Sequence, residues 1–272
     1  MQKVFDLTYK YIILATPLIL YSLISSIYLS TTIGNGKIIN LIIAFLLFMM
    51  MAGAFIAGWF NMIKIAVTFP NNDEPNSLIK QFPAGVGEYF LPAMGSIAIM
   101  LIISIFMLII SYYIGLHFIG DTGIASDSLS KALQNSNELK AFVNALTPEQ
   151  LNKLNSWNML ILGTVTFSYF IFFLYLPTLF FKKSNPFLAF FTSLKDLFSR
   201  KIFKTAGIFL LIFIINFIIS IFSTIFANNL ILHFIITLLS FYFITIASVG
   251  VFHYYYQNFI RPMLGQNVDV QV

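Results

Sequence analysis

The chain has 272 residues, of which 59% are hydrophobic and only 9% are charged. Soluble domains usually carry about 25% charged residues, so this composition excludes an ordinary water-soluble enzyme, a disordered protein and a coiled-coil rod. The chain contains no cysteine, which excludes disulfides, thiolate metal sites and cysteine nucleophiles. The formal net charge is +5. Together these features predict an integral membrane protein, in which the placement of the charges matters more than their sum.

Six apolar stretches are long enough to cross a bilayer as helices, which takes about 20 residues each. Runs such as residues 97–110 are apolar on every face and do not fit the alternating strands of a membrane barrel. The predicted fold is therefore all-α, a polytopic bundle of six transmembrane helices with interfacial amphipathic helices, in one membrane domain over residues 1–272. We expect spans at about residues 11–30, 38–67, 90–118, 157–181, 202–227 and 230–260.

Lys and Arg residues are unevenly distributed between the predicted loops. If the N-terminus is cytoplasmic, eleven of the fifteen lie inside, and three of the other four share one long segment. The positive-inside rule then predicts a multi-pass protein with both termini in the cytoplasm. The preferred hypothesis places it in a bacterial inner membrane. The whole net charge of +5 falls on the inside, because basic and acidic residues balance on the outside. We interpret the N-terminal residues as a retained first anchor.

The predicted outer segment, residues 120–156, is polar and indicates short helices. One of them covers about residues 136–146 and has an apolar face. Thr147-Pro148-Glu149-Gln150 has the spacing of a capping box, with proline at the first helical position. We expect a packed loop that covers the outer helix ends, with a partner-binding surface as the alternative.

The predicted inner segment after the fourth span contains an amphipathic helix at residues 185–201, entered through Asn185-Pro186. Phe and Leu recur on one side at intervals of three and four residues, and charged residues occupy the other. Such a helix lies in the membrane interface with its apolar face in lipid. An excess of basic residues here predicts contact with anionic lipid headgroups, the alternative being that they only enforce the inside location. The candidate contact residues are Lys182, Lys183, Lys195, Arg200, Lys201 and Lys204.

The segments that follow the second and fourth spans have a related organisation. Pro75 precedes Gly95 by 20 residues, and Pro186 precedes Gly207 by 21 residues. In both cases a segment that starts with proline leads into a returning span. The pattern indicates a parallel duplication of helical hairpins, as some transporters have.

Short motifs also carry a family resemblance. Gly58-Trp59-Phe60-Asn61 is followed by Asp73-Glu74-Pro75 and Gly95, and the last span ends in the small-residue and Tyr-rich stretch of residues 250–256. On these motifs residues 38–261 resemble a family of uncharacterised prokaryotic six-span membrane proteins. That family is similar to the membrane domain associated with glycerophosphodiester phosphodiesterases. The resemblance implies a long helix, an acidic-Pro loop, an amphipathic segment and a further span, without the catalytic domain of those enzymes.

Charged residues are absent from the middle of every predicted span, and this absence bears on function. Ionisable groups at membrane depth are costly and usually mark ion pathways or catalysis. We therefore expect no enzymatic activity, no cofactor and no metal. An intramembrane enzyme acting on lipid would need Glu88, His253 and the basic residues to meet at one lipid-facing cleft.

The preferred hypothesis is a non-enzymatic, lipid-interacting membrane subunit or scaffold. Its expected partners are membrane lipids with anionic headgroups on the inner side, with a protein partner or a second copy of the chain as further candidates, and no nucleic acid. The alternative is a transporter of small molecules or lipids with a cavity between the duplicated hairpins. The polar residues expected to line that cavity are Asn61, Thr164, Asn216 and Ser220.

Overall fold

The computed structural model describes residues 2–32, 38–70, 75–124, 130, 132 and 135–266. These residues form helices and no strand, which confirms the predicted all-α class. The chain divides into two compact units, a first unit of residues 1–99 and 171–272 and a second unit of residues 100–170. Within the described residues, six helical stretches are long and apolar enough to cross a membrane: Ile12–Thr31, Ile39–Thr68, Ser77–Phe118, Pro148–Phe181, Ile202–Ile225 and Leu230–Met263.

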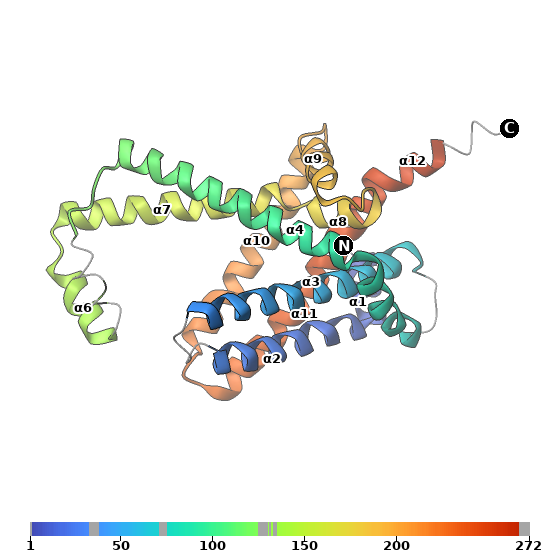
Figure 1. The fold of residues 1–272 in the computed structure, drawn as a ribbon, viewed down its shortest axis with the longest axis horizontal. Coiled ribbons are helices and arrows are strands. Elements are labelled where there is room, and N and C mark those ends of the chain that lie inside the picture. The colour runs from blue at the N-terminus through green and yellow to red at the C-terminus, as the bar shows by residue number, and fades with distance from the viewer. Residues whose placement is uncertain are drawn as a thin grey trace. The chain divides into compact units, whose positions relative to one another are not determined.

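The first unit begins with a short helix that leads into two long neighbouring ones. The helices are α1 (Gln2–Lys10), the 3₁₀ turn η1 (Ile12–Leu14), α2 (Ala15–Thr32) and α3 (Ile38–Thr68). α2 and α3 lie side by side (Figure 1). The buried indole of Trp59 donates a hydrogen bond of 2.7 Å to the carbonyl of Leu14, so a side chain of α3 satisfies the turn between α1 and α2.

Helix α4 (Pro75–Phe118) is one continuous helix of 44 residues, although Pro83 and Pro92 lie inside it. The sequence had indicated a separate interfacial segment followed by a span at residues 90–118. Each proline removes only one backbone donor. Helix α3 packs against α4 next to both prolines, because Gly58 lies against Phe82 and Gly53 lies against Met94. That packing is close at Gly85, where an added Cβ would lie 2.7 Å from the carbonyl oxygen of Ala57.

The second unit contains the later part of α4, α6 (Ser136–Ala145) and most of α7 (Pro148–Ile171). The capping box is confirmed: the Gln150 amide donates to Thr147 Oγ1 at 3.2 Å, and the Thr147 amide donates to Gln150 Oε1 at 3.1 Å. The helix that starts here is not short, however, because it continues through residue 157 into the apolar stretch. Residues 149–162 contain neither Gly nor Pro, so no residue interrupts it.

Contacts between α4 and α7 hold the second unit together. The ring of Trp157 lies against Gly115, where any side chain would overlap it, and its indole donates to the carbonyl of Gly120 at 3.1 Å. Gly120 has a φ of +79°, a conformation that favours glycine. In Figure 1 the two helices run next to each other along this unit.

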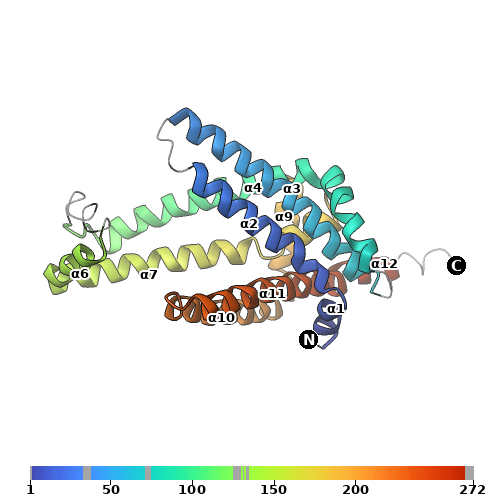
Figure 2. The same ribbon diagram turned by 90° about the horizontal axis from the view of Figure 1, so that it is seen from below.

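The rest of the first unit is a run of helices around α11. They are α8 (Tyr175–Phe181), α9 (Pro186–Leu197), α10 (Ile202–Ile225), α11 (Leu230–Tyr255), the π-helical turn η2 (Tyr256–Ile260) and α12 (Arg261–Gln266). α11 contacts α1, α2, α3, α8 and α10, and α10 runs alongside it (Figure 2). Its last turns hold the buried side chains Val249, Phe252 and Tyr255, so the core of this unit lies at that end.

Candidate functional site

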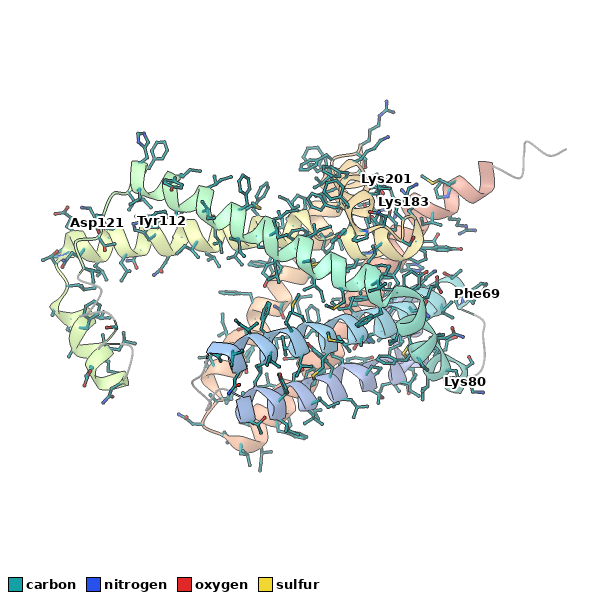
Figure 3. The ribbon with its side chains drawn as sticks, viewed as in Figure 1. Phe69, Lys80, Tyr112, Asp121, Lys183 and Lys201 are labelled. Carbon is teal, nitrogen blue, oxygen red and sulfur yellow. The ribbon has the colours of Figure 1, made fainter. Side chains whose placement is uncertain are left out.

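The basic residues of the predicted inner segment lie around α9 and the start of α10. We call the region formed by residues 182–204 and 253–261 the basic end. Figure 3 labels Lys183 and Lys201 in this region. Helix α9 enters it as predicted: Asn185 Oδ1 accepts hydrogen bonds from the amides of Phe187 and Leu188 at 3.0 and 3.1 Å, and Pro186 occupies the first turn.

The apolar residues of α9 form two faces rather than the single Phe face predicted. Ala189, Phe190, Ser193 and Leu197 are buried against the protein. A second set faces outward and is more than half exposed: Phe187 at 61%, Leu188 at 53% and Phe191 at 53% on α9, and Phe198 at 57% at its C-cap. Successive helical residues are turned by about 100°, so neighbours such as Phe190 and Phe191 fall on different faces. The outward set leaves an apolar surface next to the exposed cations.

Asp196 does not lie on a water-facing side, as the sequence pattern had indicated. Its Oδ2 accepts a charged hydrogen bond from Lys182 Nζ at 2.7 Å and another from the Tyr255 hydroxyl at 2.6 Å. The two charged side chains are only 11% and 13% exposed. The hydroxyl of Thr178 donates to that of Tyr255 at 3.0 Å, so α8, α9 and α11 meet at one carboxylate. This network holds the basic end together.

The six candidate lipid-contacting cations therefore divide into two groups. Lys182 is engaged with Asp196, and Lys201 donates to the carbonyl of Asn258 while its Nζ lies 5.0 Å from the centre of the Phe259 ring. Both side chains are at most half-exposed and hold the end of α11 in place. The four exposed cations are Lys183, Lys195, Arg200 and Lys204.

A groove of about 570 Å³ runs between α10 and α11 and ends at the basic end. Its apolar wall includes Ile208, Leu211 and Ile215 from α10, Ile246 and Ala247 from α11, and Val4 from α1. One end of the groove is polar and is lined by Lys204, His253, Tyr254, Gln257 and Asn258. No carboxylate lies among the described residues that line it, and Glu88 in particular does not. The three groups needed for a lipid-modifying enzyme are thus not brought together there.

A second and larger cavity, of about 700 Å³, lies between α2, α3 and the first turns of α4. Its walls are apolar, with Tyr21, Phe55 and Phe82 among them. Of the described residues that line it, only Lys80 is charged, and Figure 3 labels this side chain near the beginning of α4. The cavity can hold an apolar group, but the one cation in its lining is not accompanied by a cluster of polar side chains that would bind a polar ligand.

Of the four residues predicted to line a transport cavity, Thr164 belongs to the second compact unit and the other three belong to the first. Asn61 is buried and donates to the carbonyl of Gln81 at 3.0 Å. Thr164 donates to Ser111 at 2.7 Å and lines a cavity of about 530 Å³ within the second unit. Asn216 and Ser220 are exposed on α10. No cavity described above is lined by two of the four, so the transport alternative gains no support.

The helices and the basic end define a class of protein. Six helices among the described residues are long and apolar enough to cross a membrane, which places the chain with multi-pass helical membrane proteins. Comparison with protein-family models, with curated proteins and with solved structures found no match to this chain. The resemblance carried by residues 58–61 and 250–256 therefore stays a prediction.

Proposed function

We propose that this chain is a non-enzymatic protein of a bacterial inner membrane that binds anionic lipids at its basic end and serves there as a membrane subunit or scaffold. The observation that carries the proposal is the outward face of α9. Its exposed aromatic and aliphatic side chains lie beside exposed cations, with Lys195 on the same helix. A helix with this division suits the boundary between acyl chains and headgroups.

The size of the electrostatic effect supports a preference for anionic lipid. A cation near an anionic leaflet contributes about 1 kcal/mol. Half of that value for each of the four exposed cations amounts to about 2 kcal/mol, or roughly 30-fold in a binding constant. The only described carboxylate in residues 182–204 is Asp196, and its pairing with Lys182 keeps it from opposing this attraction.

The proposal includes the orientation and the kinship expected from the sequence. The excess of Lys and Arg supports a cytoplasmic location of the basic end. Kinship with the prokaryotic six-span family would be consistent with a membrane role that lacks catalysis. A protein partner or a second copy of the chain remains compatible with a scaffold, and the exposed apolar face of α9 is the surface on which we would look for it.

The experiment is a comparison of retained lipids by native mass spectrometry. Purified protein is exchanged into mixed micelles of phosphatidylglycerol and phosphatidylcholine. We expect the wild type to retain phosphatidylglycerol preferentially, and the combined variant Lys183→Gln, Lys195→Gln, Arg200→Gln and Lys204→Gln to lose most of that preference. Lys140→Gln, which removes an exposed cation of the second unit, is the control. Equal retention of both lipids by the wild type would contradict the proposal.

A further inference from the structure

The groove between α10 and α11 joins two different chemistries in one site. Most of its length is lined by aliphatic side chains, whereas its end at the basic end carries Lys204 and amide and imidazole groups. A purely apolar ligand would leave the polar end unused, and a free anion would leave the apolar walls unused. The combination is complementary to a molecule that has an apolar tail and an anionic head.

The dimensions of the groove match one leaflet of a membrane. Lys204 and Ile215 mark its extent along α10, and eleven residues of helix rise about 16 Å. The hydrocarbon core of a bilayer is about 30 Å thick, so the whole groove, with its polar end included, extends over about half of that thickness. Because α10 and α11 are antiparallel neighbours, the start of one and the end of the other bring their polar groups to the same end.

The charge at the polar end is positive. Lys204 Nζ lies 5.7 Å from the centre of the Tyr254 ring, whose hydroxyl is 2.8 Å from the hydroxyl of Thr205. A second cation lies next to the polar end: Arg261 donates a hydrogen bond of 3.2 Å to Oε1 of Gln257, which lines the groove. No carboxylate lines the described part of the groove, so nothing there offsets these two cations.

We propose that this groove binds one anionic phospholipid, with an acyl chain between α10 and α11 and its phosphate at Lys204. The inference rests on the proposed function and deepens it, because it replaces a diffuse attraction by a defined site. Lys204 then differs from the other exposed cations, since it alone lines the groove. The π-helical turn after α11 supports the arrangement by carrying Gln257 and Asn258 at the polar end.

Two pairs of variants test the site by native mass spectrometry with phosphatidylglycerol as the probe. Ala247→Phe fills the apolar part of the groove, and Gly207→Phe is its control, because Gly207 does not line the groove and an added Cβ there would meet nothing within 4 Å. Lys204→Gln removes the cation at the polar end, and Lys195→Gln removes an exposed cation outside the groove. We expect Ala247→Phe and Lys204→Gln each to reduce retention of the last phosphatidylglycerol about 10-fold, and each control to change it less than about 2-fold.

A measurement on the wild type guards against misfolding of a variant. Phosphatidylglycerol with a photoreactive acyl chain is added at about one molecule per protein, and the cross-linked peptides are identified. We expect cross-links on residues 208–215 and 243–247, reduced by an excess of unlabelled phosphatidylglycerol and unaffected by glycerol phosphate, which has the head without the tail. Cross-links that are reduced equally by glycerol phosphate would indicate an anion site and overturn the proposal.

The remaining outcomes separate this inference from the proposed function. If Lys195→Gln and Lys204→Gln weaken retention equally and Ala247→Phe has no effect, the groove proposal is wrong and a diffuse electrostatic attraction remains. If the wild type shows no preference for phosphatidylglycerol, both proposals fail. A protein segment found seated in the groove would overturn the lipid site alone.

Discussion

The hydroxyl of Tyr255 donates a hydrogen bond of 2.6 Å to Asp196 Oδ2, and the same oxygen accepts a hydrogen bond from the ammonium group of Lys182. Tyr255 lies at the end of α11 and Asp196 on α9, 59 residues apart in sequence. A carboxylate that is largely removed from water needs such partners, because an unpaired buried charge is very costly. The arrangement has consequences that can be measured.

Removal of one charge of the pair should cost much more than removal of both. We expect Asp196→Asn to lower the free energy of unfolding by about 3 kcal/mol, because Lys182 stays charged with its partner gone. The double variant Lys182→Met with Asp196→Leu should recover most of that loss. Unfolding in mixed micelles of increasing sodium dodecyl sulfate measures the effect. Lys183→Gln, at an exposed neighbour, should change stability by less than about 0.5 kcal/mol. An Asp196→Asn protein as stable as wild type would contradict this view of the network.

Two glycines of α4 that lie two residues apart should respond in opposite directions. An added Cβ at Gly85 would lie 2.5 Å from Asn61 Cβ and 2.7 Å from the Ala57 carbonyl oxygen, so Gly85→Ala should destabilise the protein by about 1–3 kcal/mol. At Gly87 nothing lies within 4 Å, and Gly87→Ala should stabilise it by about 0.5–1 kcal/mol through the higher helix propensity of alanine. Thermal unfolding of the two variants in one detergent tests the pair. Similar changes at both positions would mean that α3 and α4 are not in close contact at Gly85.

The capping box at the start of α7 should be visible in hydrogen exchange. Thr147→Ala removes the acceptor of the Gln150 amide and should weaken the first turn by about 1 kcal/mol, which corresponds to roughly five-fold faster exchange of that amide. Thr147→Ser retains the hydroxyl and is the matched control. Exchange that is unchanged in Thr147→Ala would show that the cap does not protect this turn.

The orientation of the chain can be tested by cysteine labelling, because the natural chain has no cysteine. Lys183→Cys places a single thiol at an exposed position just before α9. Glu138→Cys places one at an exposed position on α6. The positive-inside rule leads us to expect that a membrane-impermeant maleimide labels Lys183→Cys only in inverted vesicles and Glu138→Cys only in right-side-out vesicles. Labelling of both from one side would refute the predicted topology.

The starts of two helices were predicted from local sequence, and the structure confirms both. Asn185 and Thr147 cap their helices through hydrogen bonds to amides within three residues, so neighbouring residues alone specify them. Where the helices end was less predictable. Pro83 and Pro92 lie inside α4, which packs against α3 along this stretch. Helix α7 begins at Pro148 and continues past residue 157, because neither Gly nor Pro interrupts residues 149–162.

Composition and long apolar runs by themselves determined the class of this protein, because in lipid the backbone must satisfy its own hydrogen bonds and helices do so within each run. Only the tertiary structure decided the roles of its charges. Lys182 and Lys204 look alike in sequence, yet one is held by Asp196 and the other lines the groove between α10 and α11. The difference arises from contacts between residues far apart in the chain, such as Tyr255 with Asp196, which no local pattern of charge and hydropathy contains.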